Sequence, residues 1–204
     1  MDHLTPSLIA NAVLTVLCLL LAGAAWSDVR QRRIANRLVF AGAFAGIVFN
    51  TVLPEGFGFA SGLPGGLGFW IALGGLATGF GLMLPLYVLR ALGAGDVKLM
   101  AMVGAFLGPR AAVGVVLATF IAGGAMILAV VLRNGTLRLL LGNLRTMLLT
   151  AFFKLAMHET PVVDAVREPA GRMPYALAIA AGTIIYIALK STGGSLPWFL
   201  DMIG

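Results

Sequence analysis

The amino-acid sequence predicts an all-α membrane protein, a polytopic bundle of about six transmembrane helices plus one interfacial amphipathic helix. Of its 204 residues, 60% are hydrophobic and only 11% are charged, and the mean hydropathy is +0.99. Soluble domains average roughly 25% charged residues. The apolar residues form long continuous runs, whereas a membrane β-barrel would show short alternating segments. We therefore expect a helix bundle in lipid, with residues 1–204 forming a single integral membrane domain.

Six apolar runs are the candidate spans, and the first, at about 19 residues, is close to the roughly 20 residues of helix that a bilayer core requires. The expected spans are residues 8–26, 38–53, 67–89, 93–107, 111–132 and 174–189. A loop rich in glycine and proline, residues 54–66, separates the second span from the third. A tight turn at residues 108–110 separates the fourth from the fifth. The 27 glycines are expected to let these helices pack closely.

The basic residues predict the orientation of the bundle. Four arginines fall within residues 30–37 and mark the cytoplasmic side, because Lys and Arg gather on that side of membrane proteins. With the N-terminus outside, twelve of the fourteen Lys and Arg residues lie inside, all except Arg110 and Lys190. The same bias accounts for the net charge of +6, so we expect the lipid bilayer and no nucleic acid as a partner.

A basic amphipathic segment follows the fifth span. Polar residues recur at helical spacing between residues 137 and 155, among apolar neighbours; they are Arg138, Gly142, Arg145, Thr146, Thr150 and Lys154. This pattern is typical of a helix lying in the membrane interface. A seventh span is the competing interpretation, but it would place two arginines and a lysine in lipid.

A short polar interruption at residues 93–98, Gly-Ala-Gly-Asp-Val-Lys, stands between two apolar runs. An ionisable residue at the edge of a membrane segment is costly and therefore suggests a functional site. By the predicted topology Asp96 lies at the same depth as Asp28, on the cytoplasmic face. The alternative is that Asp96 only caps the start of its helix, an ordinary role for aspartate.

Two neighbouring carboxylates share a proton and titrate as a pair. The charged member can then activate water while the protonated member donates to a peptide carbonyl. Gly93 and Gly95 are expected to let a substrate strand approach Asp96. Lys98 is expected to lower the pKa of Asp96 or to bind a lipid phosphate. We expect no cofactor and no metal, because no His or Cys constellation accompanies the aspartates. The other acidic residues fall outside or in a solvated loop.

These residues resemble the type IV prepilin peptidases. Residues 93–96 match the GxGD motif of membrane aspartyl proteases, and the continuation Val-Lys-Leu is typical of this family. Asp28, a basic stretch and residues 34–36 (Ile-Ala-Asn) are similar to the family's first motif, with Ala35 where proline is usual. Residues 173–176, Met-Pro-Tyr-Ala, are similar to a Pro-Tyr segment in the last span of short members.

The resemblance implies a membrane aspartic endopeptidase in the bacterial inner membrane, with Asp28 and Asp96 as the catalytic pair at the cytoplasmic face. Its partners would be prepilin precursors, which carry a basic leader and an apolar helix. The chain lacks the N-terminal region with two cysteine pairs found in larger members. It therefore resembles the short class that serves Flp-type (tight adherence) pili, for which we do not expect N-methylation. The segment 137–155 is a candidate for substrate docking.

Three other interpretations remain open from the sequence. An intramembrane protease of the presenilin type shares GxGD, but usually places its first aspartate within a span, in a Tyr-Asp pair. A small multi-pass transporter or channel would use the two aspartates as ion ligands and would cleave nothing. A structural membrane subunit would need Asp96 only as a cap and would tolerate its replacement by asparagine.

Overall fold

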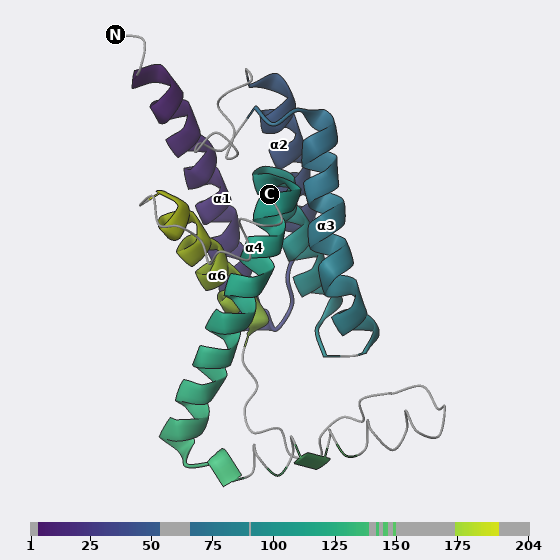
Figure 1. The fold of residues 1–204 in the computed structure, drawn as a ribbon, viewed down its shortest axis with the longest axis vertical. Helices are drawn as coiled ribbons and strands as arrows, with labels where there is room; N and C mark the ends of the chain where they lie inside the picture. The colour runs from purple at the N-terminus through teal and green to yellow at the C-terminus, as the bar shows by residue number, and fades with distance from the viewer. Residues whose placement is uncertain are drawn as a thin grey trace.

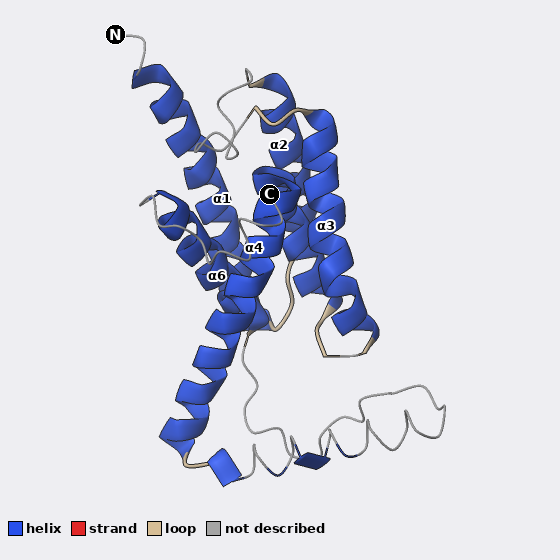
Figure 2. Ribbon diagram, viewed as in Figure 1, coloured by secondary structure: helices blue, strands red, loops and turns tan. Residues whose placement is uncertain are grey.

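The computed structural model describes residues 4–53, 66–89, 91–138, 142, 145, 146, 149 and 174–191. Every regular element in this part of the chain is an α-helix (Figures 1 and 2). The helices are α1 (Leu4–Gln31), α2 (Asn36–Val52), α3 (Phe69–Val88), α4 (Ala94–Asn134) and α6 (Tyr175–Ser191). The predicted all-α class is therefore confirmed.

Three of these helices are long and apolar enough to cross a membrane: Ile9–Gln31 within α1, then α3, then α4. Helices α2 and α6 are apolar but shorter, at 17 residues each. Large apolar side chains face outward, for example Phe44 (70% exposed) and Trp70 (78% exposed). Such a surface would favour aggregation in water and suits lipid. The chain is a membrane protein.

Two predicted segments cannot be compared with the structure. The loop at residues 54–66 falls outside the described residues except for its last position. The predicted interfacial helix at 137–155 lies mostly outside them as well. The positions described there are helical and exposed: Leu137, Arg138, Gly142, Arg145, Thr146 and Leu149.

Helix α4 is central to the bundle because it packs against each of the other four. Its backbone leaves the helical conformation at Gly108 (φ 82°, ψ 172°), and Pro109 follows. The half before Gly108 runs beside α3, and the half after it runs beside α6 (Figure 1). Helices α2 and α6 both begin near the end of α1. The first half of α4 runs in the same direction as α2, and the second half runs in the direction opposite to α6. The chain therefore reverses direction at Gly108, where the sequence predicts a turn.

The interface between α3 and the first half of α4 is formed by backbone packed on backbone. A side chain at Gly75 would collide with the carbonyl oxygen of Gly104, and one at Gly104 would collide with that of Gly75. Only glycine at both positions allows this approach. The largest fully buried side chains of the described bundle include Leu17 and Leu21 of α1, Met83 of α3, and Leu99, Met100, Met102 and Phe106 of α4.

The buried side chain of Asn50 on α2 joins three parts of the bundle. Its Nδ2 donates to the carbonyl oxygens of Ala105 (2.8 Å) and Phe106 (3.1 Å), and its Oδ1 accepts from the N–H of Leu67 (3.3 Å). In an unbroken helix, Ala105 would receive the N–H of the residue four positions on, but that residue is Pro109, which has none. Asn50 therefore donates hydrogen bonds to carbonyls whose helical N–H donors are lost where α4 reverses direction.

We expect Asn50→Leu to lower the stability of the bundle by about 1–3 kcal/mol, the cost of leaving buried polar groups unpaired. Thermal unfolding in detergent measures the change. Thr51→Val is the matched control on the same helix, because the exposed Thr51 hydroxyl bonds only to its own helix, at Ile47. Equal melting temperatures for the two variants would show that the Asn50 hydrogen bonds contribute nothing.

Candidate active site

Asp28 lies within the last turn of α1. The sequence predicts a span ending at residue 26 with Asp28 just beyond it, but the helix continues to Gln31. No glycine or proline interrupts residues 26–31, so the helix persists until Arg32 adopts a left-handed conformation (φ 53°). The N–H of Arg32 donates to the carbonyl of Asp28 (2.9 Å). Asp28 is thus held on a helix.

Asp96 lies in the first turn of α4, the third residue after the N-cap Gly93. Its Oδ2 accepts a hydrogen bond from the backbone N–H of Gly93 (3.1 Å). Asp96 therefore does cap its own helix, as the alternative interpretation of the sequence expects. This bond engages one carboxylate oxygen and leaves the other for chemistry, so capping and catalysis are compatible.

The start of α6 completes the arrangement. The N–H of Ala176 donates to Oδ2 of Asp28 (3.1 Å). The carboxylate of Asp28 is close enough to act electrostatically on Asp96, and Asp96 acts in turn on the phenol of Tyr175. Three helices thus meet where α1 ends and where α4 and α6 begin.

Both carboxylates are buried, each with 9% of its residue surface exposed. They are the only acidic residues in the described part of the chain, and no described cation forms an ion pair with either. Charges in such surroundings are costly unless hydrogen-bonded, and here each carboxylate has one backbone N–H. An acidic pair of this kind can hold one proton between two sites.

The connection between α1 and α2 borders the site and is fixed on two sides. The hydroxyl of Ser27 donates to the carbonyl of Arg33 (2.7 Å). The side chain of Ile34 covers Gly95: a Cβ added at Gly95 would lie 3.2 Å from the Cβ of Ile34. A larger residue at 95 would therefore displace this connection, as well as any substrate that approaches α4 there.

Lys98 faces α2. Its Nζ donates to Oδ1 of Asn36 (3.1 Å) and lies 5.5 Å from the centre of the Phe40 ring. The structure thus places Gly93 and Gly95 in the same helical turn as Asp96, and Lys98 on the side of α4 that contacts α2. These three positions stay predictions as substrate contacts.

Ala35, the N-cap of α2, has φ −66° and ψ 119°, and proline fixes φ near −65°. No acceptor for its N–H is found among the described residues. We therefore expect Ala35→Pro to raise the free energy of unfolding by about 0.4–1 kcal/mol, by restricting the unfolded chain. Ala45→Pro, inside α2, should instead cost about 3 kcal/mol or more. Both are read from thermal unfolding, and destabilisation by Ala35→Pro would contradict this prediction.

The participation of Tyr175 and Ala176 is not predicted from the residues themselves. Apart from beginning the last predicted span, this segment stands out in the sequence only for its resemblance to a family motif. A signal was present: Pro174 is the first residue of that predicted span, and proline is common at helix starts, where backbone N–H groups are free. A helix start at this end of the bundle offers donors to a carboxylate. Elsewhere in the described chain, no three His, Cys, Asp or Glu side chains gather as metal ligands.

The fold and the site define a helical membrane protein with two buried aspartates, contributed by different helices at one end of the bundle. Residues 15–128 match the model of the type IV leader peptidase family, and the match includes both aspartates. Because this is more than half of the chain, the protein belongs to the type IV leader peptidase family. No curated protein and no solved structure matches the chain.

Proposed function

We propose that the protein is an aspartic endopeptidase that removes the leader peptide of type IV prepilins, in particular those of Flp-type pili. The observation that carries this proposal is that Asp28, in the last turn of α1, and Asp96, in the first turn of α4, are both buried at the end of the bundle where α6 begins. Family membership supports the peptidase activity. The aspartic mechanism rests on the pair itself.

In the proposed reaction, one carboxylate is charged and takes a proton from water. The resulting hydroxide adds to the scissile carbonyl carbon, while the protonated carboxyl group donates its proton to the carbonyl oxygen. Collapse of the tetrahedral intermediate breaks the C–N bond. The leaving nitrogen takes the proton that came from water, and the other carboxylate takes a proton from a hydroxyl of the intermediate, so the pair again holds one proton. The N–H groups of Gly93 and Ala176 hold one oxygen of each carboxylate, so that both groups stay oriented throughout.

The proposed placement in the membrane follows from charge. Arginines at residues 30, 32, 33 and 37 surround the end of the bundle that holds the aspartates. By the positive-inside rule this end faces the cytoplasm. We propose six spans, with the two halves of α4 counted separately and the N-terminus outside, in the inner membrane of a bacterium. A basic leader attached to an apolar helix would bring its scissile bond to this level.

Gly93, Gly95 and Lys98 are proposed as substrate contacts, and the segment 137–155 as an interfacial docking helix. Gly93 is exposed beside Asp96, so its backbone is open to an extended substrate strand. A peptide helix must unwind before cleavage, because its carbonyls are already hydrogen-bonded. Contacts along the first turn of α4 would stabilise the unwound strand.

The proposal is tested by co-expressing the protein with an Flp-type prepilin and sizing the product on gels. We expect a shorter product whose new N-terminus, read by mass spectrometry, begins immediately after the basic leader. If the prepilin stays intact while liposomes containing the protein conduct ions, the proposal fails and a transport function replaces it.

A further inference from the structure

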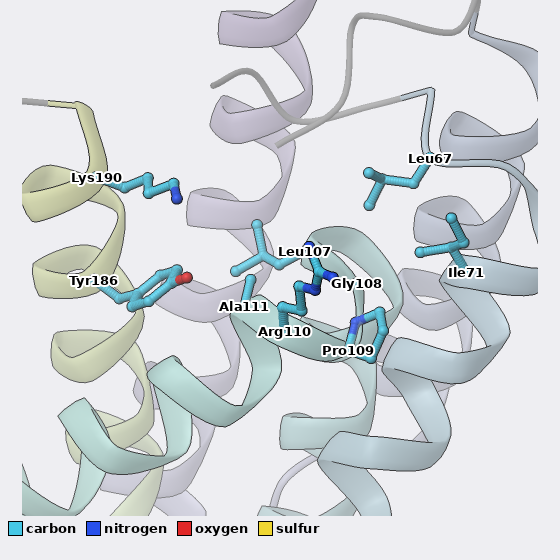
Figure 3. Close-up of a pocket in the computed structure, with 9 residues that line it drawn as sticks. All are labelled: Leu67, Ile71, Leu107, Gly108, Pro109, Arg110, Ala111, Tyr186 and Lys190. Carbon is cyan, nitrogen blue, oxygen red and sulfur yellow. The ribbon is translucent and has the colours of Figure 1, made fainter. Parts of the chain in front are cut away.

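Figure 3 shows a cavity of about 420 Å³ in the bundle. Its lining comes from the opposite ends of α4's first half and of α6 to those near Asp96 and Asp28. The cavity lies between the start of α3, the bend of α4 and the end of α6. Leu67, Ile71 and Leu107 provide apolar walls, and Arg110 and Lys190 provide the two charged groups of the lining. None of the lining residues is acidic. The cavity therefore combines an apolar wall with net positive charge.

The bend in α4 creates this space and fixes its shape. At Gly108 the two halves of α4 part, and Leu67 lies so close that an added Cβ at Gly108 would be 3.0 Å from it. Asn50 bonds to the end of the first half of α4 and to the N–H of Leu67. The wall of the cavity is thus held by buried hydrogen bonds.

The two cations of the cavity come from different helices and lack a described counter-ion. Arg110 follows the bend of α4, and Lys190 lies in the last turn of α6. Figure 3 shows the Lys190 side chain extending from α6 toward the side on which Arg110 lies. The only described carboxylates, those of Asp28 and Asp96, are at the opposite end of the bundle.

We propose that this cavity binds the phosphate head of an anionic phospholipid, with Arg110 and Lys190 on the phosphate and the apolar walls along the first methylenes. The cavity lies at the ends of membrane-embedded helices, where lipid head groups are found. A free phosphate ion would use the cations and leave the apolar walls unused. A bound lipid would join α3, α4 and α6, so it would stabilise the assembled bundle. This site is independent of the peptidase activity.

The test compares two double variants that remove the same charge. Arg110→Gln/Lys190→Gln empties the cavity of cations, while Arg133→Gln/Arg138→Gln removes two exposed arginines from the far end of α4 and just beyond it. Each protein is purified in detergent and titrated with dioleoylphosphatidylglycerol or dioleoylphosphatidylcholine. Native mass spectrometry counts retained lipid, and thermal unfolding reports stabilisation.

We expect wild type and the Arg133/Arg138 variant to retain phosphatidylglycerol in preference to phosphatidylcholine. In the Arg110/Lys190 variant, affinity for phosphatidylglycerol should fall roughly thirtyfold, from about fivefold per cation beside an anionic lipid. An equal fall in both double variants would show general attraction to charge and overturn the proposal. So would unchanged affinity in the Arg110/Lys190 variant.

A cavity-filling variant, Ile71→Trp, tests the site while both cations stay in place. We expect it to lose phosphatidylglycerol binding, because the indole occupies the space of the lipid. Retained binding would place the lipid elsewhere and contradict the proposal. Inorganic phosphate gives the last comparison: stabilisation of the wild type by phosphate equal to that by the lipid would assign the site to a free anion instead.

Discussion

Replacing Asp96 with asparagine should reduce cleavage by roughly 10²–10⁴-fold, the usual contribution of a general acid or base, while leaving the protein folded. Asparagine can still accept the N–H of Gly93 through its amide oxygen, so the cap seen at 3.1 Å is preserved. Only the proton chemistry is lost. The variant therefore separates the two roles of Asp96, because a residue that acts purely as a cap would tolerate the change.

The same reasoning applies to Asp28→Asn, whose amide oxygen can accept the N–H of Ala176. Rates are measured on a co-expressed prepilin, with membrane insertion and thermal unfolding recorded for each variant. Ser27→Ala is the matched control beside Asp28, since its hydroxyl bonds to the carbonyl of Arg33 and not to a carboxylate. Cleavage at the wild-type rate by either asparagine variant would remove that aspartate from catalysis.

Gly75→Leu should prevent the bundle from assembling, with a loss of about 3 kcal/mol or more. A side chain at Gly75 meets the backbone of Gly104 and Gly108, and the backbone cannot move aside as a flexible side chain can. Gly81→Leu on the same helix has no atom within 4 Å of the added Cβ. It should insert normally and unfold near the wild-type temperature.

The comparison is made by gel filtration and thermal unfolding in the same detergent. Because both variants add the same apolar side chain to α3, a difference between them reports packing and not hydropathy. Similar behaviour of the two variants would falsify the claim that α3 and α4 pack backbone against backbone.

Several elements are predictable from the sequence because the polarity of each segment indicates whether it lies inside the membrane or at its surface. Apolar runs give the helices, and polar interruptions give their ends. The turn predicted at Gly108 is found as the break in α4. Asp28 and Asp96 are expected at one end of the bundle from counting crossings, and in the structure both side chains are buried, one in the last turn of α1 and one in the first turn of α4.

Lateral arrangement is not predictable in the same way. A helix that meets lipid on one side and protein on the other is apolar all round, so periodicity does not show which face is buried. The donation from Ala176 to Asp28 therefore had no signal in spacing. Neither did the turn of Lys98 toward Asn36. The position of Asn50 beside the carbonyls left free at the break in α4 depends on how α2 and α4 pack, which no local pattern specifies.

The end of α1 shows a different limit. Trp26 and the arginines after it suggest the membrane boundary, and the predicted span ends there. A helix does not stop where the lipid stops, however; it stops where the backbone changes, here at Arg32. The consequence matters for chemistry, because a helical Asp28 has a fixed direction toward α6.

The central claim is that this pair of aspartates hydrolyses a peptide bond at the junction of a basic leader and an apolar helix. The most direct measurement uses the purified wild-type protein in liposomes with a synthetic prepilin-type peptide, followed by mass spectrometry in ¹⁸O-labelled water. We predict two products, cut at that junction, with one labelled oxygen in the new carboxyl group of the leader and no products from the Asp96→Asn protein. An intact peptide with the wild-type protein, or equal cleavage by the Asp96→Asn protein, would contradict the account.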